Sequence, residues 1–263
     1  MDKASRGILK FHEVMDDSQT SGIRRYRQIT VGDEGYGHLI VYELLQLLLS
    51  GLPGALGIAA RQLGYRYLFH SLGSKVVIGR NVCFRQPRKV SVGNGSVIDD
   101  FSRITVAGSR DASIRIGNKV LLGPYTVCSS RNATIEIHDY TTIGSHCRLG
   151  AMEGRLRIGQ YVMIGAFSYI GGGNHSIENL DQPMATQEFK GKGGVTIEDD
   201  VWIGGHVMIL DGVTIGRGSV VGAYSLVTKD IPPYSIAFGA PARVRGSRKA
   251  AEPQPAATGA PIP

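Results

Sequence analysis

Residues 197–244 read IEDDVW-IGGHVM-ILDGVT-IGRGSV-VGAYSL-VTKDIP-PYSIAF-GAPARV, eight six-residue units in unbroken phase. The first position is isoleucine or valine from Ile197 to Val227, and the fifth position is small or β-branched through Ala237. An amphipathic strand alternates every two residues and a coiled coil repeats every seven. A strict period of six with turn glycines after the apolar anchors is typical of a parallel β-helix instead.

The same pattern continues toward the N-terminus with wider spacing. The gap from Ile197 to Ile215 is three hexapeptides, and each earlier gap is three hexapeptides plus an insertion, the longest before Ile197. We therefore expect a three-sided coil with one hexapeptide on each side. If each insertion follows the third unit of its coil, the insertions stack along one edge of the prism. The anchors are Val92, Ile116, Ile137, Ile158, Ile197 and Ile215.

The segment from Val201 to Val244 resembles the C-terminal coils of maltose and galactoside O-acetyltransferases. It is even more similar to sugar O-acetyltransferases of bacterial polysaccharide gene clusters. The resemblance covers roughly residues 74–245 and implies an all-β repeat fold, the left-handed parallel β-helix of the hexapeptide-repeat acyltransferase superfamily. It also implies an acetyl-CoA donor, a homotrimer and active sites between subunits.

Composition bounds the remaining choices. The chain has 263 residues, 36 of them glycine, and a net charge of +7, which fits one repeat domain with appendages. No basic stripe is interleaved with aromatic residues, so we expect no nucleic-acid partner. Cys83, Cys128 and Cys147 lack metal-ligand spacing, so we expect reduced thiols, no metal and a cytoplasmic protein without a secretory signal.

Four regions follow from these patterns. Residues 1–37 are polar and without periodicity, and we expect a loosely ordered arm. Residues 38–73 form a helical hairpin broken around Pro53. Residues 74–245 form the β-helix, with a long loop at 172–194. Residues 246–263 are rich in proline and alanine, which predicts a disordered C-terminal tail.

The helical hairpin has two interpretations that can coexist. In LIVYELLQLLLS, residues 39–50, the only polar positions are Glu43, Gln46 and Ser50, and they share one narrow stripe. The hairpin can cap the open end of the β-helix. Its apolar face with a basic flank can also lie in a membrane interface, giving peripheral contact with the inner face of the membrane.

The long loop carries the candidate catalytic residue. Gly171, Gly172 and Gly173 let the chain leave the coil sharply, and His175 follows at once. In the resembling families a histidine at this point is the general base that takes a proton from a sugar hydroxyl. The chain departs from the maltose-type pattern after this histidine, which argues against a maltose-like acceptor. Glu178 or Asp181 can orient the imidazole, and the sequence does not choose between them.

The resemblance also places the donor site. A backbone amide just after the Trp-Ile-Gly segment, at Gly205 here, faces the thioester in the family, where relatives often carry Ser or Ala. Ala223 matches a position along the pantetheine arm. Thr228 and Lys229 match residues that meet the nucleotide end, and Arg243 matches a further phosphate contact.

A column of outward side chains recurs at the fourth position of the second unit, and we expect these residues to stack on a face or at the trimer interface rather than bind a metal. They are Tyr125, His146, Phe167, His206 and Tyr224.

The leading function is therefore transfer of acetyl from acetyl-CoA to a sugar hydroxyl of a polysaccharide or lipid-linked glycan. Alternatives are N-acetylation of an amino sugar, another acyl donor, or a non-enzymatic β-helical scaffold. A metal-dependent carbonic anhydrase on this fold needs three convergent histidines, and no close His pair resembles that spacing. The acceptor sugar and the position acetylated are not readable from the sequence.

Overall fold

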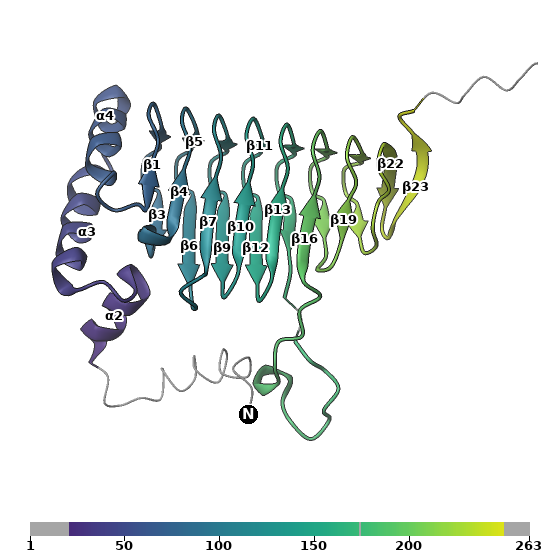
Figure 1. Ribbon diagram of the computed structural model, residues 1–263, viewed down its shortest axis with the longest axis horizontal. Coiled ribbons are helices and arrows are strands. Elements are labelled where there is room, and N and C mark those ends of the chain that lie inside the picture. Colours follow the sequence, from purple (N-terminus) through teal and green to yellow (C-terminus); the bar gives the residue numbers. More distant parts are fainter. Residues whose placement is uncertain (1–20, 174, 250–263) are drawn as a thin grey trace, which may run out of the picture.

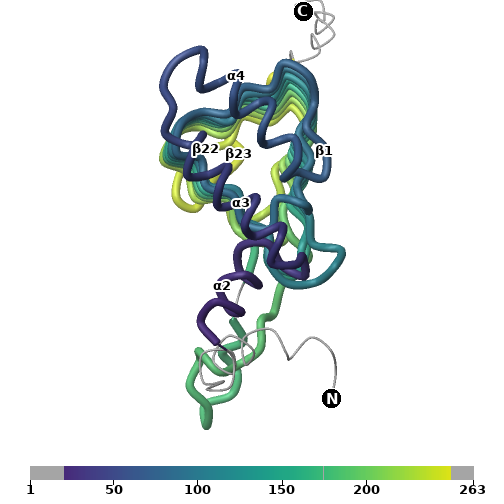
Figure 2. The backbone as a smooth tube through the Cα atoms, turned by 90° about the vertical axis from the view of Figure 1, so that its left-hand side faces the viewer, coloured from purple at the N-terminus to yellow at the C-terminus, as the bar shows by residue number. Residues whose placement is uncertain are grey.

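The computed structural model describes residues 21–173 and 175–249. Three short helices pack on one end of a long three-sided β-helix (Figure 1). Seen along the helix axis, the coils superimpose and one loop projects far from a single corner (Figure 2). The predicted fold class, a parallel β-helix of hexapeptide repeats with an N-terminal helical segment, is confirmed. Of the expected disordered tail, residues 246–249 are described and 246–247 belong to a strand, whereas residues 250–263 lie outside the described range.

Sheet A forms the first side of each coil, and all of its strands are parallel. The predicted anchors pair directly in register, as in Ile116 with Ile137 and Ile158 with Ile197. Their side chains point inward and are almost fully buried. The strands are β1 (Ser71–Leu72), β4 (Val90–Val92), β7 (Ser113–Ile116), β10 (Thr134–Ile137), β13 (Arg155–Ile158), β16 (Gly194–Ile197) and β19 (Thr214–Ile215).

Sheet B forms the second side and continues to the C-terminal hairpin. Its strands are β2 (Val77–Ile78), β5 (Val97–Ile98), β8 (Leu121–Leu122), β11 (Thr142–Ile143), β14 (Met163–Ile164), β17 (Trp202–Ile203), β20 (Val220–Val221), β22 (Ser235–Gly239) and β23 (Ala242–Ser247). Strand β23 pairs antiparallel with β22, so the last predicted hexapeptide turns back instead of continuing the coil. This strand also carries the ordered chain to Ser247, past the predicted boundary at 245.

Sheet C forms the third side. Its strands are β3 (Cys83–Arg85), β6 (Arg103–Ala107), β9 (Val127–Arg131), β12 (Arg148–Met152), β15 (Tyr169–Gly171), β18 (Met208–Ile209) and β21 (Leu226–Val227). The chain passes from sheet C to sheet A at what we call the C–A edge, and from sheet B to sheet C at the B–C edge. Every insertion lies at the C–A edge, between a sheet C strand and the next sheet A strand, as the spacing predicted.

The predicted column of outward rings lies along the B–C edge. Neighbouring rings stack with centroids 4.6–5.1 Å apart, and the column begins one coil earlier than predicted, at Phe101. Each member sits at a corner with φ between 56° and 61°. Non-glycine residues rarely adopt this left-handed region, and stacking between neighbouring coils offsets part of its cost. The members are Phe101, Tyr125, His146, Phe167, His206 and Tyr224.

The predicted hairpin packs on the first coil of the β-helix. Helix α3 (Tyr36–Leu49) and helix α4 (Gly54–Tyr65) are separated by residues 50–53 and bury their inner sides against the first coil. Arg61 of α4 connects the two helices to the first coil, and it is only 1% exposed. Its Nε donates to the carbonyl of Ile78 (2.7 Å), and its Nη1 donates to those of Leu49 (2.9 Å) and Leu52 (2.8 Å). The guanidinium thus joins the last carbonyl of α3, a carbonyl of the connection to α4 and a carbonyl of β2 in the first coil.

The expected loosely ordered arm is wrong for the part of it that the structure describes. Residues 22–31 form helix α2 (Gly22–Val31), capped by Ser21, whose side chain accepts the Arg24 amide. The amide of Gln86 at the C–A edge donates to Thr30 of this helix at 2.7 Å. Residues 1–20 of the arm lie outside the described range.

The outer side of the cap is apolar and uncovered by other described residues. Leu47 is 80% exposed and Leu56 is 85% exposed. Within residues 21–173 and 175–249, no helix has the length and apolar character needed to cross a membrane. The other large exposed apolar residues of α3, α4 and their flanks are Tyr36, Ile40, Val41, Leu44, Leu48, Leu52, Leu63 and Tyr67.

Candidate functional site

The long loop between β15 and β16 is a two-limbed projection of the C–A edge (Figure 1). His175 on the outgoing limb forms an antiparallel bridge with Phe189 on the returning limb. The two rings also contact, with centroids 4.2 Å apart at 37°. One step further out, the Ser176 amide donates to the Glu188 carbonyl at 2.8 Å. The predicted catalytic imidazole is therefore exposed but held by pairing of the two limbs.

The outer part of the loop is organised by a buried amide side chain. Gln187 is 5% exposed, and its Nε2 donates to the carbonyls of Asn179 (2.6 Å) and Gln182 (3.0 Å). Its Oε1 accepts the amide of Asn179 at 3.3 Å. A short 3₁₀ helix, η2 (Met184–Thr186), completes the tip. The sequence analysis missed Gln187, because a polar residue in a loop carries no periodic signal.

The acidic residues near His175 have different surroundings from those considered above. Glu178 pairs with Lys190 at 2.5 Å, and this hydrogen bond together with the lysine charge lowers the pKa of the Glu178 carboxyl. Glu178 therefore bonds to Lys190 across the loop. The amide of Asp181 donates to the Asn179 side chain at 2.9 Å, a turn-forming contact. A role for Asp181 in orienting the imidazole stays a prediction.

The base of the loop is tied to the next coil by Asp211, a residue that the sequence analysis did not single out. Its carboxylate is almost buried, with the residue 8% exposed. It accepts the amides of Lys192 (2.6 Å) and Gly194 (2.8 Å), where the returning limb rejoins the coil. The only sequence signal was Asp-Gly, an ordinary turn pair.

Gly205 and Ala223 lie together at the B–C edge, in adjacent coils. The Gly205 carbonyl accepts the amide of Tyr224 at 3.0 Å. The coils approach so closely that a Cβ on Gly204 would lie 2.6 Å from the Ala223 nitrogen. Within the described ranges, the backbone amide of Gly205 donates to no backbone carbonyl. These two predicted residues therefore form one contiguous surface of small side chains.

Thr228 and Lys229 follow β21 at the C–A edge and are exposed. Arg243 lies on β23, is exposed, and pairs with Phe238 across the C-terminal hairpin. Its Nη1 donates to the Ala242 carbonyl at 3.0 Å. The last coil and hairpin thus carry several exposed cations, among them Lys229 and Arg243, as a site for a phosphorylated ligand requires.

One protomer does not bring all the predicted residues together. His175 projects from the C–A edge, whereas Gly205 and Ala223 lie at the B–C edge, across the width of sheet C. A strand rises about 3.3 Å per residue, so a six-residue side separates the two edges by up to roughly 20 Å. A second protomer, packed so that its loop meets this B–C edge, would complete the set.

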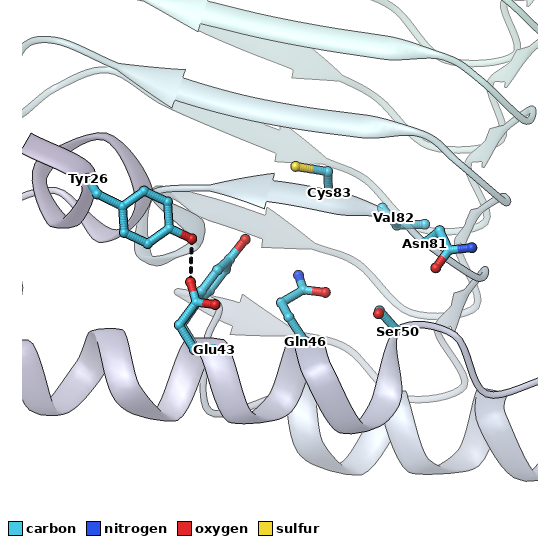
Figure 3. Close-up of a pocket in the computed structure, with 8 residues that line it drawn as sticks. Tyr26, Glu43, Gln46, Ser50, Asn81, Val82 and Cys83 are labelled. Atoms are coloured by element: carbon cyan, nitrogen blue, oxygen red, sulfur yellow. Dashed lines mark hydrogen bonds between the residues drawn. The ribbon is translucent and has the colours of Figure 1, made fainter. Parts of the chain in front are cut away.

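The described surface also contains a hollow at the cap, remote from these residues (Figure 3). It has a volume of about 290 Å³, and the Tyr26 hydroxyl donates to Glu43 at 2.5 Å in its wall. In the parts of the chain that the structure covers, no group of three His, Cys, Asp or Glu side chains is arranged to hold a metal ion. The lining residues are Tyr26, Tyr42, Glu43, Gln46, Ser50, Asn81, Val82 and Cys83.

Comparison with known proteins gives matches centred on the C-terminal coils. Residues 194–229 match the model of bacterial transferase hexapeptide repeats (six repeats). Galactoside O-acetyltransferase of Escherichia coli (strain K12) is 62% identical over 50 residues, 19% of this chain and 25% of that protein. An acetyltransferase by name from Staphylococcus aureus (strain MRSA252) is 57% identical over 56 residues, 21% of this chain and 28% of its own length. The chain thus spans about a quarter of the length of these curated relatives.

The fold as a whole has relatives among solved structures. A variant of AntD, an N-acyltransferase from Bacillus cereus crystallised with dTDP and coenzyme A, aligns over 76% of this chain and 92% of its own. It has a TM-score of 0.51 and 22% sequence identity. At this identity the likeness concerns the fold alone.

Proposed function

We propose that the protein transfers an acetyl group from acetyl-CoA to a hydroxyl of a sugar, in a polysaccharide or a lipid-linked glycan. The observation that carries the proposal is the loop after β15, which presents His175 from a rigid edge immediately before the coils that match transferase repeats. Named relatives of these coils include a galactoside O-acetyltransferase. Insertions on rigid scaffolds commonly carry function.

The reaction follows from the chemistry of the groups present. The His175 imidazole takes the proton of the sugar hydroxyl while the oxygen attacks the thioester carbonyl. The new C–O bond gives a tetrahedral intermediate, whose oxyanion is stabilised by the amide of Gly205. The C–S bond then breaks, and the imidazolium returns the proton to the coenzyme A sulfur. The products are the acetyl ester and the free thiol.

The donor is held by the last coils. The small surface of Gly205 and Ala223 admits the pantetheine arm at the B–C edge. Lys229 and Arg243, both exposed, meet the phosphates, and Thr228 lies beside them. The residues fit the donor because both cations are exposed and because Gly205 and Ala223 carry no bulky side chain of their own.

Since His175 and Gly205 lie at different edges of one protomer, we also propose a homotrimer. In it, the loop of one subunit meets the B–C edge of the next. Flat sides of a three-sided prism suit cyclic packing. Sedimentation analysis at micromolar protein tests this: a monomer under conditions that give full activity contradicts it.

The decisive experiment combines donor binding and turnover. Acetyl-CoA is titrated calorimetrically into the wild type, His175→Ala and Lys229→Ala, and acetyl transfer to a nitrophenyl galactoside is measured for each. We expect His175→Ala to keep donor affinity and lose about 10²–10⁴-fold in turnover. We expect Lys229→Ala to lose donor affinity. Near-normal turnover in His175→Ala removes this residue from the mechanism, and absence of acetyl-CoA binding in the wild type favours the scaffold alternative.

The product identifies the acceptor atom. Hydroxylamine cleaves acetyl esters but not acetamides. When the product is made from acetyl-labelled acetyl-CoA and purified, release of the labelled acetyl group by hydroxylamine therefore indicates O-acetylation, and its retention indicates N-acetylation. A hydroxylamine-stable product formed from an amino sugar replaces the hydroxyl acceptor by an amine. The same imidazole can serve either acceptor.

We propose that the enzyme is cytoplasmic and rests on an anionic membrane through the outer side of the cap. This side presents Leu47 and Leu56 with other exposed apolar residues. The exposed cations Arg24 and Arg66 lie on α2 and at the end of α4, and Glu43 on α3 is bonded to Tyr26. An apolar helix face with a basic flank binds in the interface of anionic bilayers.

Co-sedimentation with phosphatidylglycerol and phosphatidylcholine vesicles tests the membrane contact. We expect the wild type to bind the anionic vesicles and Leu47→Glu/Leu56→Glu to remain in the supernatant. Equal recovery of the wild type with and without anionic vesicles contradicts the contact. Association of the wild type through this face, abolished by the same substitutions, assigns it to a second copy instead.

A further inference from the structure

We infer that Asp211 is a positioning residue for His175, an inference that rests on the function proposed above. Asp211 lies in the coil that follows the loop, at the turn between β18 and β19. It reaches back to the loop base and does not touch the imidazole. Its task is to fix the direction in which the two limbs leave the β-helix.

The contacts of Asp211 involve both limbs at their common base. One carboxylate oxygen accepts the Lys192 amide at 2.6 Å, and the other accepts the Gly194 amide at 2.8 Å. Gly172, at the start of the outgoing limb, is so close that an added Cβ would lie 2.5 Å from Asp211 Oδ1. The carboxylate therefore bonds to the returning limb and packs against the outgoing one.

The same turn closes the base from the backbone side. The Gly212 amide donates to the Gly194 carbonyl at 2.7 Å. Gly212 has φ +82°, and an added Cβ would lie 2.8 Å from the Lys192 side chain. Three hydrogen bonds thus fasten the returning limb within residues 192–194, just where the loop becomes sheet A again.

At other positions of the C–A edge, a side-chain oxygen also accepts a backbone amide from a neighbouring coil. Asn132 accepts the amide of Ser109 at 2.8 Å and ties the shorter insertion below it on the same edge. Asp230 accepts the amide of Thr214 at 2.7 Å one coil above Asp211. Each of these side chains bonds a single amide. Asp211 bonds two and also faces the opposite limb, and its loop is the one that carries a histidine.

The geometry converts a small change at the base into a larger one at the imidazole. His175 is three residues beyond Gly172, a reach of at most about 10 Å. With that reach, a tilt of about 6° at the base moves the imidazole by about 1 Å. A displacement of this size at a catalytic group can cost about 10²-fold in rate. The proposed donor site lies on the last coils, so we expect a tilt of the loop to leave acetyl-CoA affinity unchanged.

The test compares Asp211→Asn and Asp211→Ala with a matched control, Asp139→Asn. Asp139 also accepts a backbone amide from the preceding coil, that of Asn118 at 2.8 Å, but at the edge between sheets A and B. For each protein we measure acetyl-CoA affinity by calorimetry, kcat and its pH profile with the nitrophenyl galactoside, and amide hydrogen exchange of residues 172–194.

We expect both Asp211 variants to lose about 10–100-fold in kcat, with acetyl-CoA affinity within about twofold of wild type. The pH profile keeps its shape, because the same imidazole still takes the proton. Exchange in the loop base accelerates, while the control keeps wild-type kcat and loop exchange. General damage to the fold would instead weaken donor binding along with turnover.

Any of three results overturns the inference. The first is wild-type kcat in Asp211→Ala, and the second is unchanged loop exchange in that variant. A kcat loss matched by an equal loss of donor affinity also overturns it. If the wild type transfers no acetyl group, the proposed function fails. The exchange measurement still decides whether Asp211 holds the loop.

Discussion

Replacing Arg61 by methionine should loosen the cap selectively. The change keeps an aliphatic side chain and removes the donors to the carbonyls of Leu49, Leu52 and Ile78. Leu52 is exposed, so its carbonyl can regain water. The buried Ile78 carbonyl is left without a donor, at about 1–3 kcal/mol. The Leu49 carbonyl keeps the Leu52 amide at 3.4 Å and loses its shorter bond, at about 0.5–1.5 kcal/mol. Burying methionine in place of a charged group returns about 1–2 kcal/mol, so the midpoints of these ranges leave a net loss of about 1.5 kcal/mol.

Amide hydrogen exchange under native conditions is the suitable assay, because terminal units of repeat proteins can open separately from the rest. We expect the opening free energy of α4 amides to fall by the amount above. Amides of β10 and β13 should change by less than about 0.5 kcal/mol. Arg66→Met, an exposed arginine at the end of the same helix, is the matched control. Protection of α4 in Arg61→Met equal to that in the control would refute the reasoning.

Three further predictions concern the coils. Burial opposes ionisation of Glu136, but hydrogen bonds and charges of Arg155 and Arg115 outweigh it and lower its pKa. Ionised Glu136 therefore adds about 0.5–1 kcal/mol to the free energy of unfolding, a small value because both arginines are exposed. This stabilisation is complete above the unfolded-state pKa of about 4.3 and is lost as the pH falls through the lower pKa of the folded state. Denaturation of Glu136→Gln should show a shallower acid loss than wild type, and equal acid slopes contradict this. Gly204→Ala should lower the free energy of unfolding by about 1–3 kcal/mol and weaken acetyl-CoA binding, because the backbone of the next coil occupies the space of the new Cβ. Gly150→Ala is the control, because no atom lies within 4 Å of its added Cβ. Burial raises the pKa of the Cys128 thiol to about 12, so native protein treated with iodoacetamide at pH 8 should show no modification of Cys128 by mass spectrometry, and rapid modification argues against its burial.

The coil register was predictable because inward positions repeat with a fixed period. Ile137 and Ile158 share one environment, the dry interior, and their spacing alone identifies them as equivalent. Helix α2 was not predictable in the same way. It buries only Thr30 and Val31, and its contact with the Gln86 corner comes from tertiary packing. Residues 22–31 do separate apolar from basic side chains at helical spacing, but the segment is short and mostly polar, and this pattern was missed.

The candidate site divides along the same line. His175 was found from its place in an insertion and from the resemblance of the following coils. Gln187 and Asp211 were not, because each acts through contacts with segments that have no periodic relation to it. Only the three-dimensional structure shows that a whole side of the prism separates His175 from Gly205. The number of residues between loop and coil does not reveal at which edge each residue lies.

The antiparallel strand β23 has a consequence for growth of the molecule. A parallel β-helix that simply stopped would present unpaired amides and carbonyls on its last coil, and another copy could stack on them end to end. Strand β23 covers the edge of sheet B by turning back on β22, and α3 and α4 cover the opposite end. A chain truncated after Asp230 should therefore associate in pairs through its exposed last coils, a doubling of mass that sedimentation analysis detects. Growth should stop at the pair, because α3 and α4 still cover the first coil of each copy.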